Sequence, residues 1–321
     1  MRILITGCAG FIGYHICKQL LNDNIFEVFG IDNISDYYDV KLKKSRLREL
    51  KKNKKFIFKK LDISKKKQLM NNFQENNYNY VIHLAAQAGV RYSIFKPEVY
   101  FNTNIYGFFN ILEASRIYKI KHFLFASSSS VYGDSKKFPI KENYNTDKPK
   151  SFYAATKKSN EIMAYSYSNI YKLPCTALRF FTVYGPMGRP DMAIFKFTDQ
   201  VYQNKKIQLY NNGNHKRDFT YISDAVIPVI KLIKKSPKSE VPFIAYNICS
   251  SKINNIRKIL NIIIKEIKNK KKPIMIGLQK GDVINTHGSN NLLIQTLGNF
   301  KNTNIKDGIN NFLKWYKNFY N

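Results

Sequence analysis

The sequence is poor in cysteine, and no long hydrophobic run occurs in it. The 321 residues include only four cysteines, Cys8, Cys17, Cys175 and Cys249. Their spacing matches neither a disulfide framework nor a metal site, so we expect reduced thiols, a cytoplasmic location and no bound metal. No apolar stretch is long enough to span a bilayer, and the strand pattern at the very start leaves no room for a signal peptide. We therefore expect no attachment to a membrane.

Acidic residues are also scarce. Only 22 Asp and Glu oppose 53 Lys and Arg, which gives a formal net charge of +31. Such a charge can indicate a nucleic-acid partner. The lysines are scattered over candidate helices and loops, however, as in segments 41–60, 65–67 and 268–272, and no zinc-finger, RNA-recognition or helix-turn-helix pattern accompanies them. Specific nucleic-acid binding is therefore only a remote alternative, although the positive field would favour an anionic substrate.

What the N-terminal segment does contain is a pattern typical of dinucleotide binding. Residues 2–6 predict a buried strand, and a helix is expected to continue to Leu21. Between them lie three glycines at three-residue spacing, Gly7, Gly10 and Gly13. Glycines at such a turn let a pyrophosphate approach the backbone, and the helix N-terminus attracts phosphate. A second strand, 28–31, ends at Asp32, whose carboxylate suits the ribose hydroxyls of NAD better than the 2′-phosphate of NADP.

Strands and helices continue to alternate along the chain. Strands are predicted at 56–58, 80–86 and 123–126, and helices at 104–118, 194–203 and 308–320. This alternation is typical of an α/β fold, a Rossmann-type doubly wound parallel sheet. Ser127, Ser128, Ser129 and Ser130 follow the strand at 123–126, at the edge of the sheet where ligands bind in such folds. A polar loop would give the same composition.

Tyr153 and Lys157 stand four residues apart in the segment SFYAATK, so on a helix they share one face. A phenol is a poor base at neutral pH because its pKa is about 10, and a nearby cation would lower that pKa. The pair could therefore take a proton from a sugar hydroxyl. The spacing alone is common by chance, and a buried tyrosine beside a solvated lysine would produce it too.

Taken in order, the segments TGCAGFIG, HLAAQAGVRYS, SSSSVYG, YAATK and RDFTYISD resemble the extended short-chain dehydrogenase/reductase family of nucleotide-sugar epimerases and dehydratases. Within it, RFFTVYGPMGRPDM at 179–192 and DNISDYYDVK at 32–41 most resemble the UDP-glucuronate 4-epimerases. The resemblance implies NAD as cofactor and conversion of UDP-glucuronate to UDP-galacturonate through a 4-keto sugar. It also implies a homodimer formed through the helices 104–118 and 152–171.

The resemblance assigns roles to residues that match the family's motifs. It implies that Ser128, Tyr153 and Lys157 are catalytic, with Tyr153 as the base. The cofactor-binding residues would be Gly7, Gly10, Phe11, Ile12, Gly13, Asp32, Asn33, Asp62, Ile63, Leu84, Ala85, Ala86 and Asn104, together with Tyr153 and Lys157. The substrate-binding residues would be Ser129, Ser130, Thr182, Arg189, Arg217 and Asp282.

Arg189 would decide the substrate. By the resemblance it holds the C5 carboxylate of the sugar, helped by Thr182, and a guanidinium meets a carboxylate in a two-bonded fork. The alternative is that Arg189 only pairs with Asp191 on a surface loop, where such pairs contribute little. UDP-glucose 4-epimerase and UDP-glucuronate decarboxylase are the alternative activities. Dehydration is disfavoured because dehydratases carry Asp-Glu at the positions of Ser129 and Ser130.

Two domains are predicted. Residues 1–178 would form the NAD-binding Rossmann domain, to which 219–248 return. Residues 179–218 and 249–321 would form a smaller, discontinuous C-terminal domain that binds the nucleotide sugar. The chain departs from the family's pattern at Cys249, where many relatives have Gly, and at Gly288 and Ser289, which replace a small-acid pair.

Overall fold

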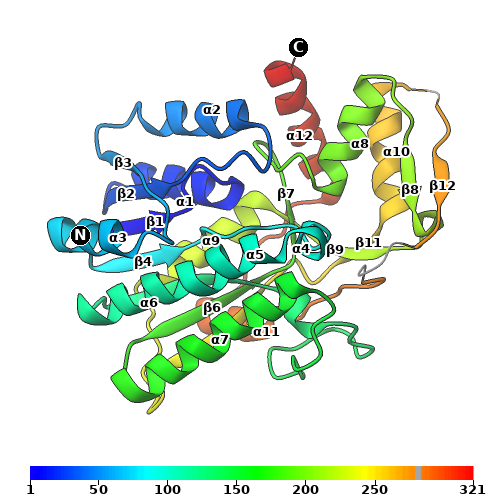
Figure 1. Ribbon diagram of the computed structural model, residues 1–321. Helices are drawn as coiled ribbons and strands as arrows, with labels where there is room; N and C mark the ends of the chain where they lie inside the picture. The colour runs from blue at the N-terminus through cyan, green and yellow to red at the C-terminus, as the bar shows by residue number, and fades with distance from the viewer. Residues whose placement is uncertain (270, 279–282, 321) are drawn as a thin grey trace.

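The computed structural model describes residues 1–269, 271–278 and 283–320 (Figure 1). Its main element is a seven-stranded parallel sheet with the strand order β10-β6-β5-β4-β1-β2-β3. The strands are β1 (Arg2–Thr6), β2 (Glu27–Asp32), β3 (Phe56–Lys60), β4 (Tyr80–His83), β5 (His122–Ser128), β6 (Cys175–Phe180) and β10 (Phe243–Ile248). The order reverses between β1 and β4, which opens a crevice at the carboxyl ends of these strands. The predicted doubly wound fold is confirmed.

Helices cover both faces of this sheet. One face packs against α1 (Phe11–Asn22), α2 (Val40–Leu50), α9 (Ile222–Leu232) and α11 (Asn291–Leu297). The other face packs against α3 (Lys66–Asn76), α6 (Phe108–Ile117) and α7 (Phe152–Tyr171). Side chains alternate between the two cores because successive residues of a strand point to opposite faces: Ile3 and Ile5 join the first core and Leu4 the second.

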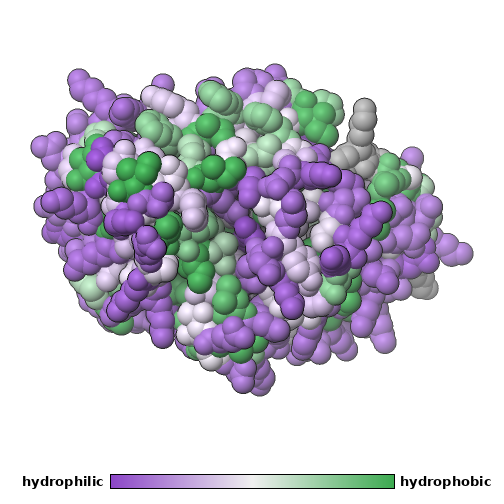
Figure 2. Space-filling view, turned by 90° about the horizontal axis from the view of Figure 1, so that it is seen from below, coloured by the Kyte–Doolittle hydropathy of each residue, from purple (hydrophilic) through white to green (hydrophobic). Residues whose placement is uncertain are grey.

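Helix α7 lies at the bottom of the molecule in Figure 1, and Figure 2 views the molecule from that side. Patches of hydrophobic surface lie there between hydrophilic side chains. On α7 itself, Ile162, Tyr165 and Ile170 are 58, 52 and 63% exposed. Within the described residues, no helix is long and apolar enough to cross a membrane.

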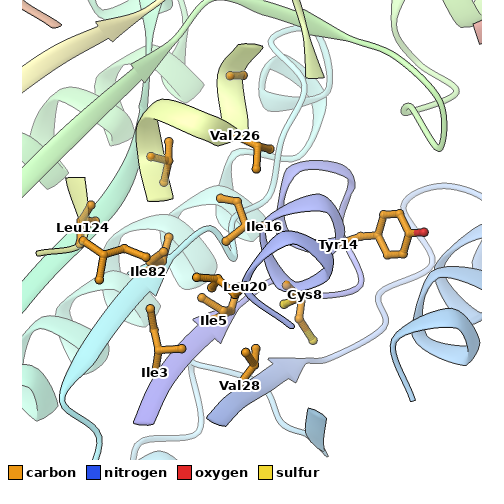
Figure 3. Close-up of a cluster of buried hydrophobic side chains, with 14 of the residues drawn as sticks. Ile3, Ile5, Cys8, Tyr14, Ile16, Leu20, Val28, Ile82, Leu124 and Val226 are labelled. Carbon is orange, nitrogen blue, oxygen red and sulfur yellow. The ribbon is translucent and has the colours of Figure 1, made fainter. Parts of the chain in front are cut away.

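The core between the sheet and α1 is shown in Figure 3. Ile3, Ile5 and Ile82 come from the strands, Ile16 from α1, and Val226 from α9. All five side chains are at least 97% buried. This packing fixes the start of α1, and with it the glycine turn that precedes the helix.

A smaller region caps the carboxyl edge of the sheet. It contains α8 (Ala193–Tyr202), α10 (Ile256–Ile267) and α12 (Ile305–Tyr320), the sheet β11 (Ile253–Asn255), β9 (Lys216–Tyr221) and β7 (Thr182–Tyr184), and the pair β12 (Ile274–Ile276) and β8 (Gln208–Tyr210). Aromatic rings from α8 and α12 form much of its core, as where Phe195 meets Phe312 and Trp315. The predicted domain boundaries remain a prediction, although α9 and β10 do return to the large sheet.

Two predicted elements are corrected. The strand predicted at 80–86 ends at His83, because the amides of Leu84 and Ala85 donate to the Thr6 hydroxyl. The helix predicted at 104–118 is present as α6 from Phe108 to Ile117, but residues 104–107 belong to a π-helix, η1 (Phe101–Gly107), that runs into α6. Its Asn104 carbonyl accepts a hydrogen bond from the Asn160 amide, which competes with a regular helical bond. The predicted helices at 194–203 and 308–320 correspond to α8 and α12.

Candidate active site

A cavity of about 1260 Å³ lies between the carboxyl ends of the parallel strands and the smaller region. The structure brings almost all of the predicted site residues to its wall. These are Gly7, Gly10, Phe11, Ile12, Gly13, Asp32, Asn33, Asp62, Ile63, Leu84, Ala85, Ala86, Ser128, Ser129, Ser130, Tyr153, Lys157, Thr182, Arg189 and Arg217. Asn104 does not line the cavity, and Asp282 lies outside the described residues.

The glycine turn is built so that no side chain fits in it. A Cβ on Gly13 would stand 2.2 Å from the Gly7 carbonyl oxygen, and one on Gly7 would stand 2.7 Å from the Ala85 nitrogen. Gly7 also has a φ of 72°, which favours glycine. The turn therefore leaves bare backbone at the N-terminus of α1, a surface that suits a pyrophosphate.

The carboxylate of Asp32 is held at the end of β2. It accepts hydrogen bonds from the amides of Ala9 (3.1 Å) and Ile34 (2.7 Å). Burial raises its pKa, and the Ile34 amide and the charge of Lys43 oppose that rise. Asn33 donates to Asp62 over 2.9 Å, which joins the ends of β2 and β3. An acid at the edge of the glycine turn fits the adenosine ribose of NAD, so these residues suit the dinucleotide expected from the sequence.

Ser128, Tyr153 and Lys157 meet across the cavity from β5 and α7. Helix α7 begins at Phe152 because Ser151 caps it, with its hydroxyl accepting from the Ala154 amide over 3.1 Å. Lys157, one turn beyond Tyr153, donates to the Ala126 carbonyl oxygen over 2.8 Å. Burial lowers the pKa of Lys157 to about 8. The ammonium is thereby fixed between the helix and the strand that ends in Ser128.

Two charged residues of the cavity wall, Arg189 and Asp191, act on the phenol of Tyr153. Burial raises the pKa of Tyr153. The hydrogen bond with Ser128 and the charge of Arg189 lower it, and the charge of Asp191 raises it further. The Lys157 ammonium faces the Ala126 carbonyl oxygen. That Lys157 lowers the phenol pKa therefore stays a prediction, and Arg189 is a second cation that lowers it.

Arg189 and Asp191 form a fork at the cavity wall. The Arg189 Nε donates to Asp191 Oδ1 over 3.0 Å and its Nη2 donates to Oδ2 over 2.5 Å. The side chains are 24 and 26% exposed, and both residues line the cavity. The Arg189–Asp191 pair, which the sequence offered as an alternative to substrate binding, is thus present. It lies at the cavity wall and not on an exposed surface loop.

Arg217 stands on β9 at the far side of the cavity. Its guanidinium donates to the Ile284 carbonyl oxygen over 2.6 Å and also to that of Val283. Another arginine of the cavity wall, Arg91, has its guanidinium 4.6 Å from the ring centre of Tyr210. That contact joins the loop after β4 to β8, so the two regions of the molecule touch across the cavity.

Asn104 has a different place from the one predicted. It is 1% exposed, and its amide side chain bonds both the amide and the carbonyl of Gln87 and the hydroxyl of Thr156. The predicted direct contact with the cofactor is therefore corrected. Asn104 lies behind the cavity wall and ties the loop after β4 to α7, because all its polar atoms are used in that link.

Sequence reasoning missed a buried ion pair behind the catalytic face. Glu161 and Arg179 share two hydrogen bonds of 2.8 Å, and their side chains are 5 and 7% exposed. Ser127 donates to the same carboxylate over 2.5 Å. The signal was available: Glu161 is two helical turns from Tyr153, on the same face of α7.

Two of the departures from the family's pattern, Cys249 and Gly288, lie close together. Cys249 is 6% exposed, and a Cβ on Gly288 would stand 2.7 Å from its Sγ and 2.6 Å from the Phe181 ring. The Cys249 thiol and the Phe181 ring together therefore occupy the space that a side chain at 288 would need. All four cysteines are buried and free, and in the described part of the chain no group of three or more His, Cys, Asp or Glu is arranged for a metal ion.

The fold and the site together define a nucleotide-binding α/β enzyme framework. The chain belongs to the NAD dependent epimerase/dehydratase family, whose model matches residues 3–249. The predicted family is confirmed, and so is the dependence on NAD that the family's name states.

Individual relatives cover the whole chain. "Protein CapI" of Staphylococcus aureus is 43% identical, over 100% of this chain and 99% of its own. A probable UDP-glucuronate 4-epimerase of Rhizobium meliloti is 38% identical, over 100% and 98%. Among solved structures, UDP-glucuronic acid 4-epimerase from Bacillus cereus, in complex with UDP-glucuronic acid and NAD, has a TM-score of 0.93 with 30% identity over all of both chains.

A neighbour with another substrate is also similar. UDP-glucose 4-epimerase from Thermotoga maritima, solved with UDP-glucose, has a TM-score of 0.89 with 27% identity over 99% of each chain. The fold alone therefore does not separate an acidic sugar from a neutral one, and the side chains at the cavity wall have to do so.

Proposed function

We propose that this protein is an NAD-dependent UDP-glucuronate 4-epimerase, which interconverts UDP-glucuronate and UDP-galacturonate. One observation carries the proposal: the guanidinium of Arg189 lies at the cavity wall, close enough to Tyr153 for its charge to lower the pKa of that phenol. A cation beside the base that acts on C4 lies within reach of the carboxylate on C5. The similarity to UDP-glucuronate 4-epimerases over the full chain supports the same substrate.

The cofactor would be held by the features around the glycine turn. Gly7, Gly10 and Gly13 leave the backbone open to the pyrophosphate, and Asp32 would accept from the ribose hydroxyls. The chemistry supplied by bound NAD is reversible hydride transfer at C4 of the sugar. Asp32 would repel a 2′-phosphate, so we expect NAD to be preferred to NADP.

Tyr153 would move the proton of the reaction. As a phenolate it would take the proton of the sugar 4-hydroxyl and return it after the 4-keto sugar has turned over in the cavity. The Ser128 hydroxyl would hydrogen-bond to the same sugar oxygen. Lys157 would keep β5 and α7 in register through its bond to Ala126, so that hydroxyl and phenol approach the substrate together.

The remaining polar residues would hold the substrate. Ser129, Ser130 and Thr182 line the cavity and offer hydroxyls to the sugar, and Arg217 would meet the pyrophosphate of UDP. We also propose that Asp282 binds the substrate, as the resemblance implies. The 4-ketone lies β to the C5 carboxylate, so decarboxylation is a hazard of this chemistry. A firm hold by Arg189 would hinder it.

The test is incubation of the purified protein with NAD and UDP-glucuronate, followed by chromatographic separation of the products. UDP-galacturonate is the expected product. Arg189→Ala should lower kcat/KM by roughly 10–100-fold, because hydrogen bonds between charged groups contribute about 1.5–3 kcal/mol. Arg189→Lys is the matched variant, since it keeps the charge but lacks the fork. Both variants should bind UDP as the wild type does.

The same assay separates the alternatives. Equal turnover of UDP-glucose would favour a UDP-glucose 4-epimerase, an activity supported by the similarity to the Thermotoga maritima enzyme. Release of CO₂ with a UDP-pentose product would favour a decarboxylase. A tight, sequence-selective complex with DNA at physiological salt would revive the remote nucleic-acid-binding alternative, since binding through charge alone falls steeply with added salt.

We also propose that the protein is a homodimer and is cytoplasmic. The exposed apolar side chains of α7, Ile162, Tyr165 and Ile170, support an interface on the face seen in Figure 2, where two copies would pair α7 and the helix that begins with η1. Light scattering at micromolar concentration tests the assembly, and a monomer there would contradict it.

A further inference from the structure

The Arg189–Asp191 fork uses only part of the guanidinium. Asp191 takes the edge formed by Nε and Nη2, and the remaining nitrogen, Nη1, has no hydrogen-bond partner within residues 1–269, 271–278 and 283–320. Both side chains border the cavity and are about a quarter exposed. A ligand in the cavity can therefore reach a guanidinium whose best edge is already occupied by a carboxylate of the protein.

Asp191 is a charged occupant. Burial alone would raise its pKa, but the charge and hydrogen bonds of Arg189 hold the pKa below its usual value. The pair is thus neutral as a whole. A second carboxylate from the sugar has to share this guanidinium or displace Asp191 from it, because the Nε–Nη2 edge holds one carboxylate at a time.

The surroundings of Asp191 can receive it when it leaves the fork. The Tyr37 hydroxyl lies 3.5 Å from Asp191 Oδ2, at the limit of a hydrogen bond. Lys196, which also lines the cavity, contributes a positive charge that stabilises the Asp191 carboxylate. A displaced Asp191 would therefore keep a donor and a cation nearby, which lowers the penalty that normally attends a broken, half-buried ion pair.

We propose that Asp191 is a competing carboxylate: it yields the Arg189 fork to the carboxylate of the substrate and takes it back while the sugar turns over. The inference rests on the proposed epimerase function and goes beyond it. Epimerisation presents opposite faces of the sugar in turn, so the carboxylate has to leave Arg189 while the sugar turns. The hold that hinders decarboxylation then applies before and after that step. Without a competing carboxylate, Arg189 would bind the substrate more tightly before it reacts. Stabilising only that bound state raises the free-energy barrier to rotation of the 4-keto sugar.

The experiment compares the wild type with Asp191→Asn, which keeps the shape of the side chain and removes its charge. The dissociation constant of UDP-glucuronate, measured by calorimetry on the NAD-loaded protein, should fall about tenfold, since about 1.4 kcal/mol of competition is a factor of ten. The kcat for UDP-glucuronate should fall by several-fold. Affinity for UDP, which lacks the carboxylate, should stay the same and reports that the variant is folded.

Two matched variants isolate the effect. Asp199→Asn removes another carboxylate from the same cavity wall, one that pairs with Lys205 and Tyr316 rather than with Arg189, and should leave both constants unchanged. In an Arg189→Ala background, Asp191→Asn should no longer tighten binding of UDP-glucuronate, because the group competed for is gone.

Other results would overturn the inference. Weaker binding of UDP-glucuronate to Asp191→Asn would mean that Asp191 orients Arg189 instead of competing for it. Unchanged binding and turnover would mean that the fork plays no part. In both cases wild-type epimerisation of UDP-glucuronate would still stand. If the wild type neither binds nor converts UDP-glucuronate, the proposed function fails first and the inference fails with it.

Discussion

Two arginine–carboxylate forks, one behind the cavity wall and one on it, differ in how many of their hydrogen-bonding groups have partners. In the Glu161–Arg179 pair the guanidinium also donates through Nη1 to the Tyr132 hydroxyl and the Glu142 carbonyl oxygen. In the Arg189–Asp191 pair Nη1 has no partner among the residues that the structure describes. One arginine is saturated by the protein, and the other has a donor to spare.

The pairs differ in burial and in what they connect. Glu161 and Arg179 join α7 to β6 and are 5 and 7% exposed, whereas Arg189 and Asp191 belong to one loop and are about a quarter exposed. A buried, saturated pair resists exchange because breaking it leaves an uncompensated charge. A pair that is a quarter exposed and has a free donor can change partners. Similar local geometry thus serves structure in one place and recognition in the other.

The comparison predicts the largest difference in stability. Arg179→Ala should lower the free energy of unfolding by ~3–5 kcal/mol, because Glu161 would stay buried without its partner. Arg189→Ala should cost under about 1 kcal/mol, since Asp191 can reach water. Urea denaturation at a fixed NAD concentration measures both. Equal decreases in the free energy of unfolding would show that the two ion pairs contribute equally to stability, against this comparison.

A second variant on α7 separates stability from chemistry. Tyr153 lies two turns before Glu161, and Tyr153→Phe removes only the proton-transfer group. We expect turnover to fall by roughly 10²-fold or more with little change in unfolding, the reverse of the pattern for Arg179→Ala. Steady-state kinetics and denaturation of the same preparation provide the check. Near-normal turnover would remove Tyr153 from the mechanism.

The pH dependence of kcat should distinguish the forks next. Burial raises the pKa of Tyr153, Arg189 lowers it and Asp191 raises it. Turnover that needs the phenolate rises with pH, so Arg189→Ala should move that rise to higher pH and Asp191→Asn to lower pH. Arg179→Lys should not move it, because the buried pair is not among the groups that shift this pKa. Shifts of the same sign in the two cavity variants would contradict the assignment.

The smallest effect on turnover is expected at Ser127. Its hydroxyl donates to Glu161, which keeps both bonds from Arg179 when that hydroxyl is removed. Ser127→Ala should therefore cost about 1 kcal/mol of stability, the usual contribution of one hydrogen bond, and leave kcat close to that of the wild type. A large loss of turnover would mean that Ser127 does more than tie β5 to the saturated fork.

The local patterns of the sequence predicted much of this structure. The strand at 2–6 matches β1, and the glycine turn and Asp32 lie where their spacing indicated. Tyr153 and Lys157 share a face because helical spacing alone requires it. These features depend on neighbours in the chain, which is why they could be read from it.

What the sequence could not supply were choices between distant partners. The ammonium of Lys157 faces Ala126 on another strand, and Arg189 pairs with Asp191, one of two interpretations that the motif allowed. The carbonyl oxygen of Asn104, in the π-helix, accepts a hydrogen bond from Asn160, which is 56 positions away. Each of these hydrogen bonds depends on how separate elements pack together. The spacing of residues within one element therefore does not predict it.

The contact between Cys249 and Gly288 makes two distant positions mutually dependent. A methyl group at 288 collides with the thiol, whereas glycine at 249 would leave a void beside Phe181. Removing the thiol alone would not admit a side chain at 288, because the Phe181 ring would still stand 2.6 Å from its Cβ. Substitutions that relatives tolerate at one of these positions will therefore be misjudged if they are transferred singly, and grafting segments between family members should carry positions 181, 249 and 288 across together.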